Sequence, residues 1–216
     1  MSNNDVAFHE NDSTTPDASL GRPLQLQIAR YVSNVCSPFV VSLPLVFLIA
    51  LYHAPMQGQA IFYAFVTLFF LSVGPLLYII VGVRRGKFTD IDVSVRSQRL
   101  WPFVFGLASA TVGLLILTLT RGPQNLETLL LITILSGIIM TIITLWWKIS
   151  LHASSLAGAA TILTAFYGTI MLPTFLLVIA VSWSRVVLRR HTVAQVIAGT
   201  LLSIGLTMLI LTLRNR

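Results

Sequence analysis

Two short polar segments interrupt a chain that is otherwise strongly apolar, and each contains a histidine beside cationic side chains. The first, residues 148–152, ends at His152, and the second, residues 184–195, contains His191. Both lie at the ends of apolar stretches long enough to cross a bilayer, where ionisable groups are costly and therefore usually functional. Two imidazoles with Lys, Arg and Ser around them indicate phosphate chemistry at a membrane surface.

The spacing within each segment predicts which side chains act together. Lys148 and His152 are four residues apart, as are His191 and Gln195, and such pairs share one face of a helix. The side-chain carbonyl of Gln195 can accept a hydrogen bond from one ring nitrogen of His191 and so fix its tautomer. An oriented base of this kind is suited to nucleophilic attack. His152 is then the candidate for protonating a leaving oxygen.

Cationic side chains close to these histidines are candidates for phosphate binding. Arg185 can hold phosphoryl oxygens with a bidentate fork, and Lys148 can hold them as a point charge. Arg96 and Arg99 stand three residues apart just before an apolar stretch. Taken alone, basic residues at such a place are ordinarily anchors that follow the positive-inside rule. They become candidate site residues because three polar segments, 84–100, 148–152 and 184–191, are expected on the same face of the membrane.

Composition places the chain in a membrane. Of its 216 residues, 56% are hydrophobic and 10% are charged, and the mean hydropathy is +0.86. Soluble domains carry about 25% charged residues. The formal charge of +7 is gathered in segments between the apolar stretches, which favours membrane orientation or anionic headgroups over nucleic acid. The single Cys36 excludes an intrachain disulfide framework and a Cys-rich metal site.

The apolar stretches predict an all-α fold, a polytopic transmembrane helical bundle of six to seven spans over residues 37–216. A span needs about 20 apolar residues, within a range of about 17–25. Gly168 and Pro173 mark a turn that divides one stretch too long for a single helix. The expected segments are 37–53, 59–83, 101–120, 125–147, 153–170, 172–188 and 192–213.

The N-terminal part has a different character. Residues 1–20 are polar and rich in Asn, Asp, Ser and Thr, and we expect a disordered tail. Residues 21–36 alternate apolar with basic and amide side chains, which is typical of an amphipathic helix on the membrane surface.

Counting the crossings predicts where the polar segments meet. If each expected stretch spans once, the 84–100 loop, residues 148–152 and residues 184–191 lie on the same face of the membrane. His53 then falls on the opposite face, and His9 lies in the tail. Most of the cations share the face of the three segments, so the positive-inside rule favours a cytoplasmic site, although several of these cations belong to the candidate site itself.

At these residues the chain resembles a known family. Ser184-Arg185, five residues, His191, three residues and Gln195 resemble the third signature of the type 2 phosphatidic acid phosphatase (PAP2) superfamily, Ser-Arg-x5-His-x3-Asp. Residues 149–152 resemble its second signature, Pro-Ser-Gly-His, in the Ser and His positions. Arg99 and Pro102 resemble the Arg-Pro end of its first signature. The resemblance covers about residues 85–205 and keeps the order of the three signatures.

The chain departs from the family pattern at three places. Asp92 stands where the Lys of the first signature is expected, and two residues, Leu100 and Trp101, are inserted before Pro102. Either Arg96 or Lys148 is a candidate for replacing the missing cation. Gln195 replaces the usual Asp, as in the variant that polyprenyl and dolichyl diphosphatases carry. A neutral Gln stabilises an imidazolium less than a carboxylate does, which predicts slower turnover.

The resemblance implies a lipid phosphatase that uses neither a metal nor a cofactor. His191 would attack phosphorus and form a phosphohistidine, His152 would protonate the leaving group, and water would then release phosphate. The implied phosphate-binding residues are Arg185, Lys148, Ser150, Arg99 and Arg96. The residues themselves also give no metal-binding pattern, because Asp90 and Asp92 are the only carboxylates on that face after the tail.

Several functions stay open at this point. The expected substrate is an isoprenoid phosphate or diphosphate, followed by phosphatidic acid or phosphatidylglycerol phosphate. A non-enzymatic protein that binds or transports anionic lipids is the alternative, supported by Asp92 and Gln195. An unrelated small transporter would predict inverted repeats or polar residues at mid-span, and the sequence has no convincing repeat. The lipid tail and the oligomeric state are not determined by the sequence.

Overall fold

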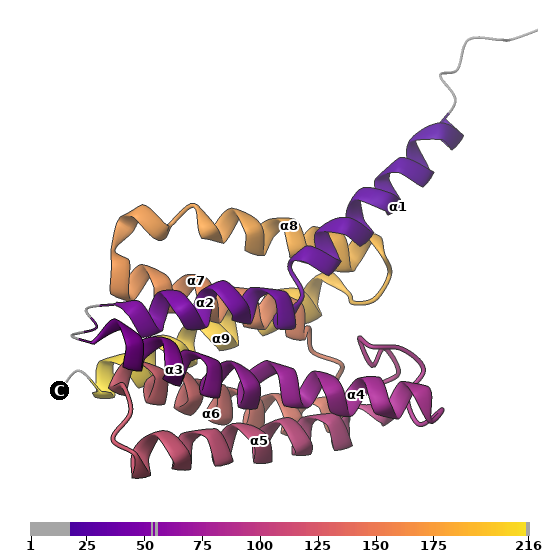
Figure 1. Ribbon diagram of the computed structural model, residues 1–216. Coiled ribbons are helices and arrows are strands. Elements are labelled where there is room, and N and C mark those ends of the chain that lie inside the picture. Colours follow the sequence, from indigo (N-terminus) through magenta and orange to yellow (C-terminus); the bar gives the residue numbers. More distant parts are fainter. Residues whose placement is uncertain (1–17, 53, 55, 215–216) are drawn as a thin grey trace, which may run out of the picture.

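The computed structural model describes residues 18–52, 54 and 56–214, and this part of the chain is mostly helical, with its longest connection between residues 84 and 100. Helices α2 to α9 lie side by side with their axes roughly aligned, and α1 extends from one end of the bundle (Figure 1). The helix bounds are α1 Ala18–Val35, α2 Pro38–Leu51, α3 Gln57–Leu68, α4 Gly74–Arg84, α5 Leu100–Leu119, α6 Gln124–Trp146, α7 Leu151–Tyr167, α8 Thr174–Val187 and α9 Val193–Arg214. The predicted all-α helical bundle is therefore confirmed.

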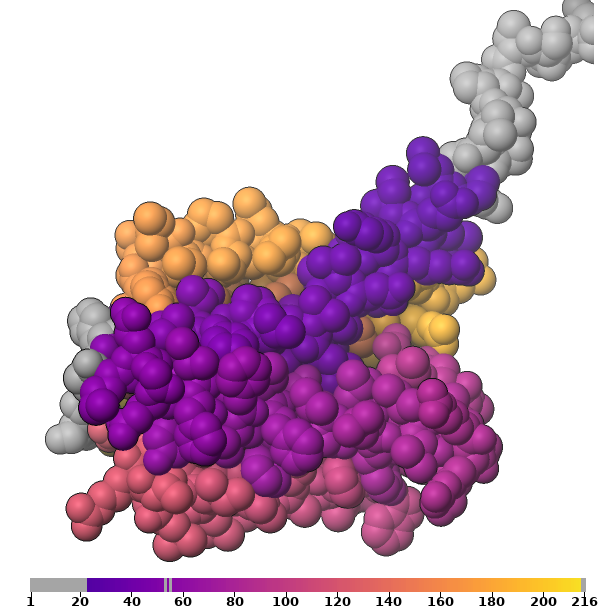
Figure 2. All heavy atoms as spheres, viewed as in Figure 1, coloured from indigo at the N-terminus to yellow at the C-terminus, as the bar shows by residue number. Residues whose placement is uncertain are grey.

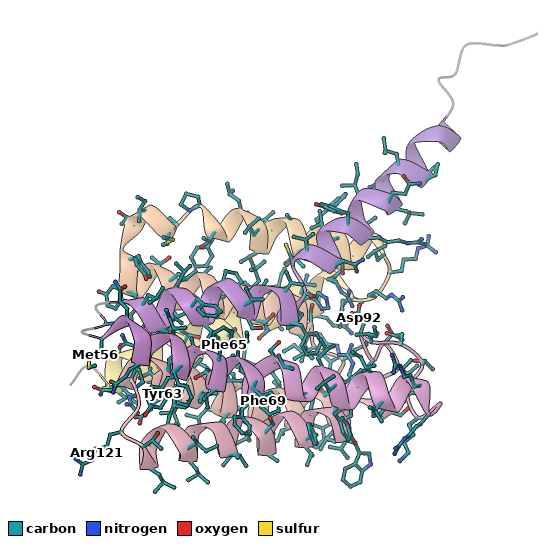
Figure 3. All side chains as sticks on the ribbon, viewed as in Figure 1. Met56, Tyr63, Phe65, Phe69, Asp92 and Arg121 are labelled. Atoms are coloured by element: carbon teal, nitrogen blue, oxygen red, sulfur yellow. The ribbon has the colours of Figure 1, made fainter. Side chains whose placement is uncertain are left out.

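Length and hydropathy make this an integral membrane protein. A π-helical turn, Phe69–Val73, joins α3 and α4 into one apolar helix, Gln57–Arg84. In the described part, five helices are long and apolar enough to cross a membrane, and the bent pair of α1 and α2 adds a sixth candidate. The predicted segments agree with these helices to within a few residues. Large apolar side chains such as Phe65 and Phe69 face outward from α3 and the π-turn (Figure 3), as a lipid environment requires.

Helix α7, which corresponds to the predicted span 153–170, has 17 residues and is not among the candidate membrane spans of the described part. It packs against α2, α8 and α9, and most of its small side chains are buried. At Gly158 an added Cβ would lie 2.8 Å from Ser203 Oγ on α9, so the two backbones approach closely. Small residues permit such approach between membrane helices. The stretch of small residues in α7 thus serves helix packing, as its composition indicates.

Local signals explain several helix ends. The hydroxyls of Ser37 and Ser150 cap α2 and α7 by accepting from backbone N–H groups three residues on. Helix α7 ends at Gly168, whose φ of +79° lies in the left-handed region that favours glycine. Pro173 stands immediately before α8. The turn predicted from Gly168 and Pro173 is therefore present.

The N-terminal predictions have a mixed outcome. Helix α1 begins at Ala18, so the last three residues of the predicted disordered tail, 1–20, are helical, and the rest of that tail lies outside the described residues. Residues 21–35 are helical, as expected. Helix α1 makes an angle of 42° with α2 and packs on α8. Its placement on the membrane surface stays a prediction, as does the cytoplasmic face, and His53 lies outside the described residues.

Candidate functional site

The three polar segments meet at one end of the bundle. In Figure 1 the loop after α4, the α6–α7 connection and the α8–α9 connection all lie at the end from which α1 extends. Arg185 Nη1 donates to Asp92 Oδ2 at 2.8 Å, and Arg99 Nη1 donates to the carbonyl oxygen of Ile149 at 3.2 Å. The backbone N–H of Ser150 reaches the carbonyl oxygen of Gln195 at 3.4 Å. Residues separated by 45 to 93 positions thus form a single site.

A glycine on α9 permits this meeting. A Cβ added at Gly199 would lie 2.8 Å from the carbonyl oxygen of Ser150, closer than real Cβ contacts. The first turns of α7 and α9 therefore pack with their backbones nearly in contact. This packing fixes His152, in the first turn of α7, relative to His191, which precedes α9.

The His191 ring is held in one tautomer by Gln195. His191 Nδ1 lies 3.1 Å from Gln195 Oε1, and the same oxygen accepts from the backbone N–H of Thr192 at 3.1 Å. Because a backbone N–H can only donate, the Gln195 atom facing both groups is the oxygen. Nδ1 of His191 therefore carries the hydrogen, and Nε2 keeps its lone pair. Gln195 takes the orienting position that the sequence predicts.

The surroundings of His191 keep its ring neutral. Burial lowers its pKa most, and the charges of Arg99, Arg185 and Lys148 lower it further, while the Gln195 hydrogen bond acts in the opposite direction. The result is a pKa of about 3, against an ordinary value of 6.5. A neutral imidazole at pH 7 has the lone pair that a nucleophile needs.

His152 is buried and lies beside a carboxylate. Its Nε2 is 4.0 Å from Asp92 Oδ1. His152, His191 and Asp92 line the same cavity, which has a volume of about 230 Å³. In Figure 3 Asp92 lies where α1 and the connecting loops come together. The structure thus brings the two predicted histidines to one space, with a carboxylate that sequence reasoning did not assign to the site.

Two buried arginines lie near the histidines: Arg99 lines the same cavity, and Arg185 lines a neighbouring hollow. Arg99 is 3% exposed and Arg185 is 2% exposed. Arg99 Nε donates to the carbonyl oxygen of Val93 at 2.9 Å, so the guanidinium also holds the loop before α5. Arg185 Nη1 donates to Asp92 and to Ser33 Oγ of α1 at 2.7 Å. Buried arginines require such partners, and both would suit an anion.

Lys148 lies near the same charges but is half-buried and does not line the cavity. Burial lowers the pKa of Lys148, and the like charges of Arg99, Arg185 and Arg190 lower it further. Mutual repulsion of this kind shows a concentration of positive charge that an anion would relieve.

Two predicted phosphate-binding residues have other contacts. Arg96 Nη1 donates to the carbonyl oxygen of Leu145 at 2.7 Å, and Arg96 lines a different hollow from the histidines. Arg96 is therefore not among the residues that line the cavity with the histidines. Ser150 is fully buried, and its hydroxyl accepts the capping N–H of Ala153 at 3.5 Å. Its observed role is to begin α7.

Sequence reasoning missed three contributors to the site. The resemblance gives Asp92 only as a departure from an expected lysine, whereas in the structure Asp92 binds Arg185. Ser33 of α1 supplies a second partner to the same arginine, and Arg190 Nη1 donates to Ser94 Oγ at 2.7 Å. These bonds join residues about 90 to 150 positions apart, and no spacing rule connects such pairs. The run Arg189-Arg190 beside His191 was the one available signal for Arg190.

A second cavity adjoins the first. It has a volume of about 240 Å³ and lies deeper in the bundle, among α2, α6, α7 and α9. The two cavities share seven lining residues, which are Pro38, Phe39, Leu71, Thr133, Gly137, Met140 and Leu151. A largely apolar space therefore extends inward from the histidines.

Among the described residues, no group of three or more His, Cys, Asp or Glu side chains is arranged to hold a metal ion. The donors at the site instead suit an anion. No protein-family model, curated protein or solved structure matches the chain.

Proposed function

We propose that the chain is an integral membrane lipid phosphatase that hydrolyses a lipid phosphomonoester or diphosphate through a phosphohistidine. An isoprenoid phosphate or diphosphate is the favoured substrate, followed by phosphatidic acid or phosphatidylglycerol phosphate. One observation carries the proposal. His152 and an oriented, neutral His191 line one cavity beside two buried arginines. The resemblance of the three segments to PAP2 signatures points to the same chemistry.

His191 is the nucleophile in this proposal. Its Nε2 lone pair attacks phosphorus while the bond from phosphorus to the leaving oxygen breaks, and a nitrogen–phosphorus bond forms. Gln195 keeps Nδ1 protonated throughout, so the ring becomes an imidazolium-like phosphohistidine with its remaining N–H still bonded to Oε1. Arg99 and Arg185 stabilise the negative charge on the transferred phosphoryl oxygens.

His152 is the general acid. A phosphate dianion that enters beside it favours the protonated ring, and the ring then gives its proton to the leaving lipid alcohol or phosphate. Water completes the cycle: it loses a proton to His152 as its oxygen attacks phosphorus. Breakage of the nitrogen–phosphorus bond releases inorganic phosphate and restores both histidines.

The deeper cavity supports a lipid as the substrate. Its apolar lining from α2, α6 and α7 continues directly from the space beside the histidines. Together the two cavities fall in the range of about 300–1,000 Å³ that small-molecule sites occupy. One linear hydrocarbon chain placed there would leave its phosphate end at His191, which favours a prenyl chain over a two-tailed lipid.

The decisive experiment measures inorganic phosphate released by the full chain in detergent, with EDTA present. Polyprenyl diphosphate, polyprenyl phosphate and phosphatidic acid are supplied separately, and His191→Ala is the control. Release by the wild type and not by the folded variant is the expected result, and the three rates rank the substrates. Equal release by the variant would remove His191 from the nucleophile role.

A specific observation favours the non-enzymatic alternative. Asp92 already occupies Arg185, so a cationic pocket could serve lipid binding or transport without turnover. In that case no lipid releases phosphate, while the folded chain still binds anionic lipids. The same experiment therefore separates the two functions.

A further inference from the structure

Asp92 stands between two hollows of different character. The inner cavity contains both histidines. The outer hollow, of about 810 Å³, is bordered by α1 and by the end of α8 with the turn that follows it. Its polar lining includes Arg30, Ser33, Arg185 and Arg190. Of the described residues that line either space, Asp92 alone lines both. Figure 2 shows the recess between α1 and the loop after α4 from outside.

The Asp92 carboxylate occupies the position on Arg185 that an external anion would use. Its Oδ2 accepts from Arg185 Nη1 at 2.8 Å, while the carboxylate is 34% exposed and the guanidinium 2% exposed. Arg185 Nε is buried and has no hydrogen-bond partner among the described residues. Carboxylates and phosphates bind guanidinium groups in the same bidentate manner. Arg185 is therefore an incompletely satisfied anion site with an internal ligand.

The carboxylate is ionised at neutral pH. Partial burial acts to raise the pKa of Asp92, but His152, Arg185 and Arg190 together lower it below its ordinary value. An anion entering the inner cavity therefore meets one negative charge beside His152. A headgroup with a single negative charge offers Arg185 no more than Asp92 already does.

The backbone beside Asp92 is strained. Val93 has a φ of +46°, a conformation that is rare for a β-branched residue. Its buried side chain packs with Ile79 and Phe88, and its carbonyl oxygen accepts from Arg99. Strain of this kind persists where the surroundings impose it. The position of Asp92 is therefore fixed by the contacts of its neighbour Val93 as well as by its own bond to Arg185.

We propose that Asp92 is a specificity-determining residue, an internal ligand of Arg185 that a phosphoryl dianion displaces and a monoanionic phosphodiester does not. This inference rests on the proposed function. The bilayer around the protein consists of lipids whose phosphodiester groups carry one negative charge. Without Asp92, those headgroups would occupy Arg185. With Asp92, only a phosphomonoester or diphosphate, which carries two or more charges for Arg185 and Arg99 together, binds productively.

The test compares Asp92→Asn with Asp90→Asn in the full chain. Asp90 is in the same loop, and its carboxylate accepts from Thr89 and Ser94 with no contact to Arg185. The control therefore removes the same charge two residues away. We measure KM and kcat for polyprenyl phosphate in micelles, with and without phosphatidylglycerol as a competing monoanionic lipid.

Asp92→Asn is expected to lower KM roughly tenfold, which corresponds to about 1.4 kcal/mol. It is also expected to become sensitive to phosphatidylglycerol, while the wild type and Asp90→Asn are not. An unchanged KM with a lower kcat in Asp92→Asn would overturn the proposal. It would show that Asp92 acts on His152 during turnover and does not compete with the substrate for Arg185. Equal inhibition of wild type and Asp92→Asn by phosphatidylglycerol would overturn it as well.

A second measurement does not need turnover. Inorganic phosphate that binds the folded chain raises its melting temperature. The phosphate concentration that gives a fixed rise in melting temperature is expected to fall roughly tenfold in Asp92→Asn and to stay unchanged in Asp90→Asn. If the Asn variant does not fold, Asp92→Ser replaces it. If the wild type binds inorganic phosphate but releases none from any lipid, the proposed function is wrong. The comparison of melting temperatures between the wild type and Asp92→Asn then still tests the role of Asp92.

Discussion

Replacing Gly199 by alanine tests whether the close approach of α9 to the segment before α7 positions the two histidines. The new Cβ would lie 2.8 Å from the Ser150 carbonyl oxygen, whereas ordinary contacts begin at 3.4 Å. The two backbones must therefore separate by about 0.6 Å, which is 3.4 minus 2.8. A backbone oxygen cannot rotate away as a side chain can. Overpacking of this kind costs about 1–3 kcal/mol.

Gly205→Ala is the matched control on the same helix. A Cβ added at Gly205 has no atom within 4 Å. Both variants gain the same intrinsic helix propensity, so the difference between them isolates the clash. For a chain of this size, about 1 kcal/mol corresponds to about 2–4 °C, and we expect Gly199→Ala to melt roughly 2–12 °C below Gly205→Ala.

Turnover provides the second readout of this pair. The Ser150 N–H reaches the carbonyl oxygen of Gln195, whose side chain orients His191. Because displacement of reacting groups by about 1 Å can cost about 100-fold, a shift of about 0.6 Å should lower kcat for polyprenyl phosphate roughly tenfold. Gly205→Ala should leave kcat unchanged. Equal melting temperatures and equal turnover in the two variants would refute the reasoning.

The remaining predictions concern the cavity, the orienting amide and pH. Ser136→Phe places a ring in the deeper cavity, where the Ser136 hydroxyl lacks a hydrogen-bond partner among the described residues. Ser136→Phe should lower kcat/KM for polyprenyl phosphate at least about tenfold and leave kcat/KM for a short-chain phosphate unchanged. Leu135→Phe, at an exposed position on the same helix, should leave kcat/KM for both substrates unchanged. Gln195→Asp should retain or raise kcat, because a carboxylate also accepts from His191 Nδ1, and complete loss in a folded variant would contradict the orienting role. The pKa of His191 is about 3 in the folded chain against an ordinary 6.5, so its contribution to stability is complete above pH 6.5 and is lost as the pH falls towards 3. The melting temperature of His191→Asn should therefore fall less between pH 7 and pH 4 than that of the wild type. If the melting temperatures of both proteins fall equally over this range, the pKa of His191 is not lowered in the folded chain.

Hydropathy predicted the helices well because a lipid environment leaves few alternatives. Each apolar stretch must satisfy its backbone internally, so a stretch of sufficient length becomes a helix. Helices α5 and α6 begin and end within a residue of the predicted segments. An even number of expected spans separates the three polar segments from one another, which predicted that they lie at the same end of the bundle. The bonds from Arg185 to Asp92 and from Arg99 to Ile149 join those segments in the structure.

Spacing rules do not apply to the parts of the site where the backbone is not a regular helix. Arg96 and Arg99 stand three residues apart, which on an α-helix gives one shared face. Arg96 instead lies in a short 3-10 turn before α5, and its guanidinium reaches Leu145 while that of Arg99 reaches Val93. Asp92 lies in an irregular loop with Val93 in the left-handed region. No periodicity describes such a loop, so its contact with Arg185 could not be predicted from the sequence.

The two departures from the PAP2 signatures have related electrostatic consequences. Relative to those signatures, Asp in place of Lys at position 92 changes the local charge by −2, and Gln in place of Asp at position 195 changes it by +1. The sum is −1, yet Arg99, Arg185 and Lys148 still surround the histidines with positive charge, which lowers the pKa of His191. The carboxylate that the signatures place beside the nucleophilic histidine stands here beside Arg185 and His152. The neutral amide at position 195 keeps His191 oriented through Nδ1 and adds no second carboxylate to the site. In the proposed function, Asp92 and Gln195 therefore have separate roles. Asp92 occupies the anion site on Arg185 until a dianion arrives, and Gln195 holds the hydrogen on Nδ1 of His191, so that Nε2 keeps the lone pair that attacks this dianion.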